Sequence, residues 1–366
     1  MTGALLPEGF HDRLPPLADA AARVERALLG AAHRHGYERV EPPLVEFETS
    51  LAGRLKSART TNAVRFIDPV SQGSLAIRPD ITAQVGRIAA SRMAHHPRPL
   101  RLSYAGPVLK LRASPLDPSR ERHQVGCELI GRDTVAAARE IVRVAVEALA
   151  EAGVSGVSID FTLPDLVETL AAGPLPLDAE RTALVRAALD AKDAGMVAEL
   201  APEYLPLVEA AGPFDTALAR LRAFDVGGVL ATRLDGLAAI ADGLNVRLTL
   251  DPTERHGFEF QSWLGFSVFA EGVGRELGRG GSYTVVHDNG AEEPAVGFSL
   301  YRDAVLDTGA AASERRRLFI AFGSDPAAAA ELRAQGWVTV AGLEAEDSAA
   351  AQLCTHTMVD GRPREI

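Results

Sequence analysis

Residues 104–113 read YAGPVLKLRA, and residues 122–131 read RHQVGCELIG. Both stretches have the apolar character of β-strands, and the segment between them, ASPLDPSRE, is a polar turn with two prolines. The pattern therefore predicts a β-hairpin with a polar loop. A strand, a polar loop and a return strand commonly hold a charged ligand, so this hairpin is the first candidate for a binding site.

The second strand of the hairpin carries an alternating pattern. Side chains alternate between the two faces of a strand, so Gln124, Gly126 and Glu128 share one face, and Val125, Cys127 and Leu129 share the other. A glutamine and a glutamate with a glycine clearing space between them suit a small polar cation. An exposed sheet face with ordinary polar residues is the alternative interpretation.

Helical patterns surround the hairpin. Leu17, Ala21, Val24, Leu28 and Ala32 recur at helical spacing, and Gly36 stands where a C-terminal cap belongs. A strand over 74–78 leads into a helix that begins near residue 82, where aspartate and threonine are suited to capping. A long helix that ends at Gly153 follows the hairpin.

The rest of the chain divides into two kinds of segment. Alanine- and leucine-rich helical pieces with Pro/Gly breaks form a helical insertion at about 163–247, after which antiparallel strands resume. The glycine-rich stretch 271–282 has no phosphate-loop ending and is predicted to be a turn between two of these strands. The final 366 − 312 = 54 residues alternate strand and helix. We predict an α+β core over 1–312, with an antiparallel sheet flanked by helices, and a small C-terminal α/β unit over 313–366.

Composition narrows the class of protein. Hydrophobic residues make up 47% and charged residues 24% of the chain, as in ordinary globular proteins. The net charge, 38 − 49 = −11, disfavours nucleic-acid binding. We expect no membrane span, because no apolar run approaches the ~20 residues that one needs. Cys127 and Cys354 are the only cysteines and lie far apart, which excludes a disulfide framework and fits a cytoplasmic protein.

Four ordered motifs give the chain a family resemblance. They are LAIRPDITAQVGR, GPVLKLRASPLDPSRERHQVGCELIG, RGGSY and EPAVGFSLYRDAVL. In this order, from about residue 6 to 305, they resemble the catalytic core of histidyl-tRNA synthetase, a class II aminoacyl-tRNA synthetase. The resemblance implies a class II antiparallel sheet flanked by helices.

The positions that match the family's ATP-binding residues have changed. The family's phenylalanine-arginine-x-glutamate element aligns with residues 109–112, so Lys110 replaces the arginine and Arg112 replaces the glutamate. A lysine lacks the planar fork of an arginine. The second ATP arginine aligns with Ala304, and the family's catalytic arginine aligns with His256. Two lost charged anchors cost about 3–6 kcal/mol, or about two to four decades of ATP affinity. Arg302 lies on a different helical face and is no substitute. We expect no adenylation.

The amino-acid end of the site is better preserved. The resemblance implies that Asp80, Thr82 and Gln124 hold the α-amino group of histidine, and that Glu128 and Tyr283 define the imidazole pocket. Gln261 replaces a family tyrosine on the imidazole side. No catalytic residue, metal or cofactor is expected.

The combination of features resembles one particular branch of the family. The 54 C-terminal residues are too few for the anticodon-binding domain of the synthetases, so tRNA binding is not expected. A synthetase-like core without its ATP contacts or tRNA domain resembles the regulatory subunits of ATP phosphoribosyltransferase, which act in the first step of histidine biosynthesis. That resemblance implies a non-catalytic chain that activates the short catalytic subunit in a hetero-octamer and mediates inhibition by histidine.

Further expectations concern self-association and rival functions. We expect a self-dimer through the extended segment around Glu41–Phe47, where Pro42 and Pro43 disfavour a central strand. Two other functions stay open: a ligase that joins an amino acid to an acceptor other than tRNA, and a free-standing histidine sensor.

Overall fold

The chain folds into two compact units. The computed structural model describes residues 6–51, 55, 63–112, 118–255, 261–310 and 316–366. The first unit spans Met1–Ala311 and the second spans Ala312–Ile366. Along the described parts of the chain, no helix combines the length and the apolar character needed to cross a bilayer.

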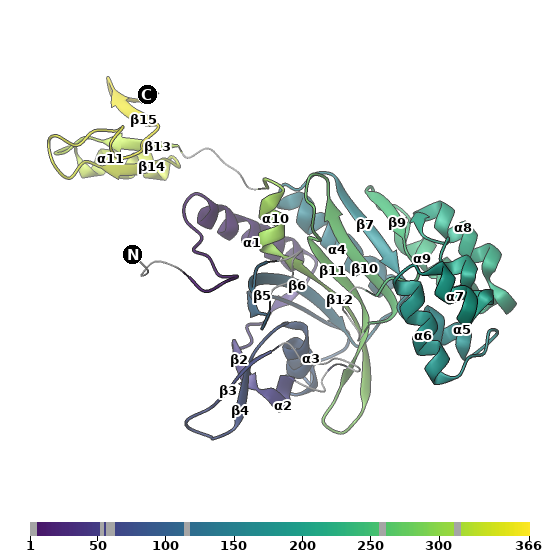
Figure 1. Cartoon of the computed structure of the whole chain (residues 1–366). Helices are drawn as coiled ribbons and strands as arrows, with labels where there is room; N and C mark the ends of the chain where they lie inside the picture. The colour runs from purple at the N-terminus through teal and green to yellow at the C-terminus, as the bar shows by residue number, and fades with distance from the viewer. Residues whose placement is uncertain (1–5, 52–54, 56–62, 113–117, 256–260, 311–315) are drawn as a thin grey trace. The chain divides into compact units, whose positions relative to one another are not determined.

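A nine-stranded mixed sheet forms the centre of the first unit (Figure 1). In spatial order its strands are β1 (Glu38–Arg39), β5 (Leu100–Leu109), β6 (Glu121–Ile130), β12 (Glu292–Tyr301), β11 (Gly278–Val286), β10 (Gln261–Ala270), β7 (Val157–Thr162), β9 (Arg247–Leu250) and β8 (Gly212–Pro213). Neighbouring strands are antiparallel except for the pairs β1–β5 and β7–β9, which are parallel. The α+β class predicted from the sequence is confirmed.

The predicted hairpin is the pair β5 and β6. The two strands pair in antiparallel register from Leu100 opposite Ile130 to Leu109 opposite Glu121. Strand β12 then lies on the other side of β6 and places Gly297 opposite Glu128. Residues 113–117 of the predicted loop lie outside the described residues.

The two faces of the sheet are covered by different helices. On one face, α1 (Leu17–Arg34) and α4 (Val135–Glu151) bury the alternate β6 residues Val125, Cys127 and Leu129 in the main core. On the other face, α3 (Thr82–Ala90) packs with Tyr104 and Tyr283 in a second, smaller core. The alternation of β6 predicted from the sequence is confirmed, and it leaves the polar face of β6 beneath α3.

Local sequence signals explain where the helices begin and end. Helix α1 buries Ala21, Val24, Leu28 and Ala32 of its predicted stripe, but Leu17 is 57% exposed, so its prediction as a stripe residue was wrong. Gly36, with a positive φ of 80°, follows the end of the helix. The backbone N–H of Thr82 donates to the Asp80 carboxylate at 2.7 Å, so the predicted capping aspartate sits at the start of α3. In α4, the side chain of Thr134 accepts from the Ala137 N–H, and Gly153 adopts a positive φ of 86° beyond the end.

Two smaller groups of elements complete the first unit. A three-stranded sheet has the order β2 (Val45–Phe47), β4 (Ser74–Ile77) and β3 (Val64–Ile67), and α2 (Glu48–Leu51) adjoins it. Figure 1 shows this sheet together with α3 at the lower edge of the unit. Helix α10 (Arg302–Asp307) directly follows β12 and packs against α1.

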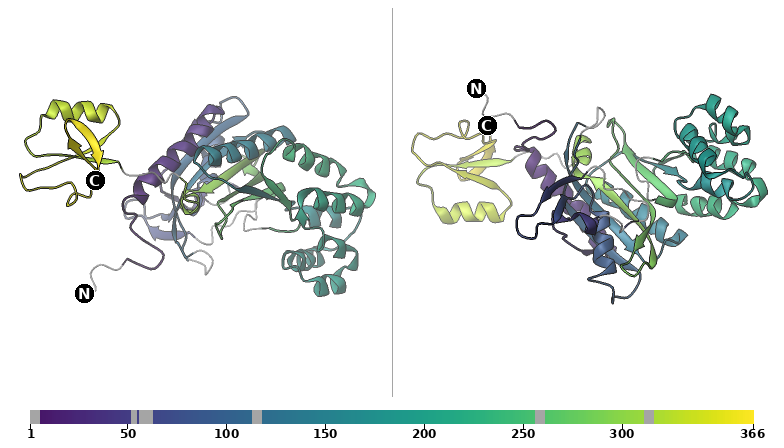
Figure 2. Two further views of the ribbon diagram at one scale, coloured as in Figure 1. Left: turned by 90° about the horizontal axis from the view of Figure 1, so that it is seen from above. Right: turned by 60° about the horizontal axis from the view of Figure 1, so that its bottom comes forward.

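The predicted helical insertion consists of short helices. They are α5 (Leu166–Ala171), α6 (Ala179–Asp190), α7 (Ala194–Leu200), η1 (Pro202–Leu207), α8 (Phe214–Phe224), η2 (Val226–Gly228) and α9 (Ala231–Ala241). Both views of Figure 2 show these helices, in teal, gathered at the end of the unit away from α1, in purple.

The second unit is a small α/β fold. Its elements are β13 (Arg317–Ile320), α11 (Pro326–Ala334), β14 (Val338–Ala341), β15 (His356–Val359) and β16 (Arg362–Glu365). The strands have the order β14-β13-β15-β16, with β13 parallel to β14 and β15. Strand β16, which the sequence pattern did not indicate, pairs with β15 in antiparallel fashion.

One sequence expectation about the glycines was wrong. The predicted turn over 271–282 ends before Gly278, and Gly278, Gly280 and Gly281 lie inside β11. A Cβ atom on Gly280 would lie 2.4 Å from the carbonyl oxygen of Gly297, and one on Gly281 would lie 2.4 Å from that of Leu264. These glycines are therefore required by close contact with neighbouring strands, and they border the candidate site.

Candidate functional site

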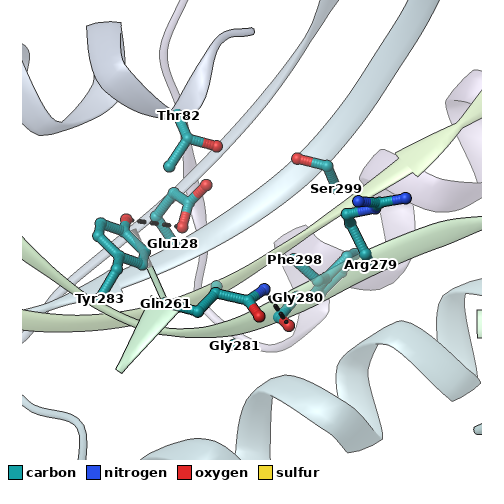
Figure 3. A pocket seen from close by; sticks show the side chains of 10 residues that line it. Thr82, Glu128, Gln261, Arg279, Gly280, Gly281, Tyr283, Phe298 and Ser299 are labelled. Atoms are coloured by element: carbon teal, nitrogen blue, oxygen red, sulfur yellow. Dashed lines mark hydrogen bonds between the residues drawn. The ribbon is translucent and has the colours of Figure 1, made fainter. Parts of the chain in front are cut away.

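The centre of the candidate site is the carboxyl group of Glu128. This residue lies in the middle of β6, and its side chain receives a hydrogen bond from the Tyr283 hydroxyl at 2.7 Å and another from the Tyr104 hydroxyl at 3.0 Å. Figure 3 shows the Tyr283 bond and the position of Glu128 beneath Thr82. Glu128 is only 1% exposed, so water does not solvate the carboxyl group in this state.

A second group of polar residues adjoins this carboxyl group. The Gln124 side chain donates to the Asp80 carboxylate at 2.7 Å and to the Ser299 hydroxyl at 2.5 Å, and its carbonyl accepts from the Ile81 N–H at 3.0 Å. Tyr104 connects the two groups, because its hydroxyl also shares hydrogen bonds with Ser299 at 2.8 Å and with Thr82 at 3.2 Å. One continuous polar network results.

The network contains all five residues that the resemblance singled out. They are Asp80, Thr82, Gln124, Glu128 and Tyr283. Gln124 is completely buried and Thr82 is 5% exposed. The alternative interpretation of β6 as an exposed polar sheet face was therefore wrong.

The expected role of Gly126 needs a correction. We expected its missing side chain to clear space for a ligand between Gln124 and Glu128. A Cβ atom on Gly126 would lie 2.4 Å from the Tyr104 hydroxyl, so this space holds the hydroxyl that bonds Glu128. Gly126 supports the network, and the open space lies further along the sheet.

Burial raises the pKa values of the two carboxyl groups of the site, those of Glu128 and Asp80. Removal from water raises the pKa of the Glu128 carboxyl to about 8, against the opposing effect of the bonds from Tyr283 and Tyr104. Burial also raises the pKa of Asp80, although Gln124 and Thr82 stabilise its charged form. At neutral pH the Glu128 carboxyl therefore keeps its proton in this state. A cation or a basic nitrogen that entered beside it would recover the energy that burial costs the carboxylate.

The cavity next to Glu128 is small in this state. It is lined by Thr82, Glu128, Gln261, Arg279, Gly280, Gly281, Tyr283, Gly297, Phe298 and Ser299, and its volume is about 20 Å³. That is room for about one water molecule. The Gln261 amide lies against the cavity and donates to the Gly280 carbonyl at 2.8 Å, as Figure 3 shows. A ligand the size of an amino acid therefore requires a lining side chain to move, and we expect Gln261 to do so.

The positions that match the ATP contacts are arranged differently. Ala304 is 1% exposed and lies in the main core, so the first unit has no room for an arginine there. Arg302 forms an ion pair with Glu25 of α1 at 3.0 Å and does not line the cavity. Lys110 follows β5, Arg112 is exposed, and His256 lies outside the described residues.

Several residues of the site were not predicted as site residues. Arg279 and Ser299 come from the consecutive strands β11 and β12, whereas Tyr104 comes from β5, far away in the sequence. Strand pairing brings the three residues together. A period-two pattern in β12 places Gly297 and Ser299 on one face and is the single local signal that could have indicated Ser299.

Comparisons with known proteins show the family of the chain. The family model for histidyl-tRNA synthetase matches residues 9–305. The ATP phosphoribosyltransferase regulatory subunit of Paramagnetospirillum magneticum is 44% identical over 350 residues, which cover 93% of this chain and 91% of that protein. The protein of the same description from Rhodospirillum centenum is 46% identical, with coverages of 99% and 96%.

A solved structure supports the fold. The crystal structure of an ATP phosphoribosyltransferase regulatory subunit/histidyl-tRNA synthetase from Bacillus halodurans superimposes with a TM-score of 0.81. The overlap covers 96% of each chain at 21% identity, so this likeness concerns the fold alone. The class II synthetase-like architecture predicted from the sequence is confirmed.

The first prediction tests the packing around Glu128. A Cβ atom at Gly297 would lie 1.6 Å from Oε2 of Glu128, so Gly297→Ala must displace the carboxyl group from its hydrogen bonds. We expect a loss of about 1–3 kcal/mol in the free energy of unfolding, because a buried polar group loses its partners. Urea denaturation measures it.

Gly274→Ala is the matched control for this experiment. Gly274 has no heavy atom within 4 Å of a built Cβ, so we expect a change within about 0.5 kcal/mol. Equal stability of the two variants would contradict the tight packing of Gly297 against Glu128.

Proposed function

The chain belongs to the family of ATP phosphoribosyltransferase regulatory subunits, which share the histidyl-tRNA synthetase core, and from this premise we propose that it binds histidine in the pocket at Glu128 and controls the catalytic subunit. It is a regulatory and not a catalytic subunit, it acts in histidine biosynthesis, and it partners the catalytic ATP phosphoribosyltransferase subunit. Our proposal concerns how it does so.

The observation that carries the proposal is the buried carboxyl group of Glu128. A buried carboxyl group costs stability even when tyrosine hydroxyls bond it, and a chain without use for a ligand would do as well with an apolar residue there. An imidazole nitrogen beside Glu128 would add a basic partner to the bonds from Tyr104 and Tyr283. Asp80 and Gln124, joined at 2.7 Å, are placed to receive the α-ammonium group of the same ligand.

The positions that match the ATP contacts of the synthetases support a regulatory use of the Glu128 pocket. The buried methyl group of Ala304 offers no charge to a phosphate, and Lys110 offers no bidentate fork. We propose that the chain neither adenylates an amino acid nor binds tRNA. Histidine would then act through a coupling free energy between its pocket and the active site of the catalytic subunit.

We also propose the assembly and its place in the cell. The catalytic partner would be the short form of the enzyme, in a hetero-octamer. Cys127 and Cys354 are both free and buried, which suits the reducing cytoplasm, where we place the complex.

A self-dimer would form through the segment Glu41–Phe47. Leu44 and Phe47 are 42% and 47% exposed, and Phe66 and Ile67, on β3 of the same three-stranded sheet as Phe47, are 43% and 62% exposed. Exposed apolar side chains of this size favour burial against another surface. We propose that a second copy of the chain covers them.

The pH dependence of histidine binding tests the pocket. Between the imidazole pKa of about 6.5 and the Glu128 pKa of about 8, the free site holds one proton and the free imidazole holds none. A Glu128–imidazole pair also holds one proton. Binding then neither takes up nor releases a proton, so we expect a plateau of affinity between these values. Below about pH 6.5 the free imidazole is protonated, so the affinity should fall because binding must release one proton. Above about pH 8 the free Glu128 carboxyl is ionised, so the affinity should fall because binding must take up one proton. Isothermal titration of L-histidine across this range measures it.

Two controls sharpen the titration. Glu128→Gln should weaken histidine binding at least about tenfold, whereas Glu121→Gln, at the exposed end of the same strand, should leave it unchanged. ATP titrated into the wild-type chain should give no signal. Affinity that keeps rising below pH 6, or micromolar ATP binding, would contradict the proposal.

The catalytic partner provides the functional test. We expect addition of the chain to the short catalytic subunit to raise phosphoribosyltransferase activity up to a fixed ratio, and histidine to suppress it. Glu128→Gln should keep the activation and lose the suppression. Histidine binding without any effect on the catalytic subunit would favour the free-standing sensor instead.

Light scattering tests the self-dimer. At micromolar concentration we expect a dimer, and Leu44→Glu should weaken it by at least about tenfold because a charge would enter an apolar interface. Leu184→Glu, at a similarly exposed leucine of α6, is the control and should leave the dimer intact. A monomeric wild-type chain would refute this part of the proposal.

A further inference from the structure

The sheet face that holds Glu128 has a positively charged end. On β6, Arg122 lies on the same face as Gln124 and Glu128, because residues two apart along a strand share a face. Opposite Arg122 on β5 is Val108, and Lys110 follows two residues later on the same side. This face of the sheet therefore has the carboxyl group of Glu128 at one end and the cationic side chains of Arg122 and Lys110 at the other.

Arg279 joins these cations to the cavity. Its side chain is 19% exposed and lines the same cavity as Glu128, and both side chains project from the sheet in Figure 3. Glu276 accepts from the Arg279 Nε at 2.9 Å, which fixes the orientation of the guanidinium.

The local charge balance favours an anion. Burial is the main cause that lowers the pKa of Lys110 to about 8, and the nearby charges of Arg122 and Arg279 lower it further. Glu276 raises the pKa of Lys110 in turn, and both Glu276 and Glu254 raise the pKa of Arg279, so at least two carboxylates act on these three cations. An anionic group that entered here would relieve the excess.

The spacing of the two ends fits one small molecule. Glu128 pairs with Gly297, which pairs with Gly281, and Arg279 lies two residues from Gly281 on β11. The Cα atoms of Glu128 and Arg279 are thus two strands and two residues apart, about 12 Å. Both side chains shorten this distance, which leaves a gap on the scale of an amino acid and not of a nucleotide.

We propose that Arg279, with Lys110 and Arg122 beside it, forms an anion subsite that binds the α-carboxylate of the amino acid held at Glu128. This inference rests on the proposed histidine pocket. Arg279 would then be the residue that distinguishes an amino acid from the corresponding amine or alcohol.

Titration with three ligands tests the subsite. L-Histidine carries a carboxylate, whereas histidinol and histamine do not, and all three carry the imidazole. We expect the wild-type chain to bind histidine roughly 10- to 100-fold more tightly than the other two. Arg279→Ala should remove this difference by weakening histidine alone, and Arg279→Lys should restore part of it.

Two further variants keep the test decisive. Arg275→Ala is the matched control, because the adjacent Arg275 pairs with Asp307 at 2.9 Å and does not line the cavity; it should leave the histidine-to-histidinol ratio unchanged. Glu276→Gln should raise the affinity for histidine but not for histidinol, because a competing carboxylate is neutralised. The Glu276→Gln variant and the comparison of histidine with histidinol still test the carboxylate contact if Arg279→Ala fails to fold.

The results that overturn the inference are distinct. Equal wild-type affinity for histidine and histidinol would exclude a carboxylate contact while the histidine pocket stands. Equal weakening of histidine and histidinol by Arg279→Ala would make the residue structural. No histidine binding by the wild-type chain would refute the proposed function itself.

Discussion

The buried hydrogen bonds between the Glu128 carboxyl and the hydroxyls of Tyr104 and Tyr283 constrain the rest of the first unit. They join the hairpin of β5 and β6 to β11, a strand that comes from a distant part of the sequence. For the carboxyl to fit, Gly297 must lack a side chain, and for the Tyr104 hydroxyl to reach it, Gly126 must lack one too. A slip of one residue in the register of any of these strands would turn a polar side chain into the apolar core. The sheet is thus built around a group that costs energy to bury.

In the proposed function, that cost is the physical link between the fold and regulation. A carboxyl whose pKa is raised to about 8 by burial would gain a partner if a basic nitrogen bound beside it, so the site would respond to a ligand that the rest of the core does not need. At the positions that match the ATP contacts, Ala304 is packed into the main core and Arg302 is paired with Glu25. Under our proposal, the chain senses an amino acid without activating it. In a regulatory subunit, such binding can bias the partner only by as much as the two states of the complex differ in their affinity for the ligand.

Local patterns in the sequence were sufficient for part of this picture. Strand alternation predicted that Gln124 and Glu128 share a face, and helical spacing with glycine and aspartate signals predicted α1 and the start of α3. The hydrogen bond from Tyr283 to Glu128 joins residues 155 positions apart, and no local pattern contains the register that makes it. For the same reason the sequence did not reveal that Tyr104 fills the space above Gly126, or that the glycines of β11 are strand residues. The Gln261 side chain lines the cavity and bonds the Gly280 carbonyl of the neighbouring strand, a contact that no local pattern in the sequence predicts.

The most direct test of the central claim is a crystal structure of the chain grown with L-histidine and a non-hydrolysable ATP analogue together. We expect histidine beside Glu128, with Gln261 displaced from its bond to Gly280, and no ordered nucleotide near Lys110. Ordered phosphates at Lys110, or a Glu128 pocket that stays closed at saturating histidine, would contradict the claim that the amino-acid site was kept for regulation while the nucleotide site was lost.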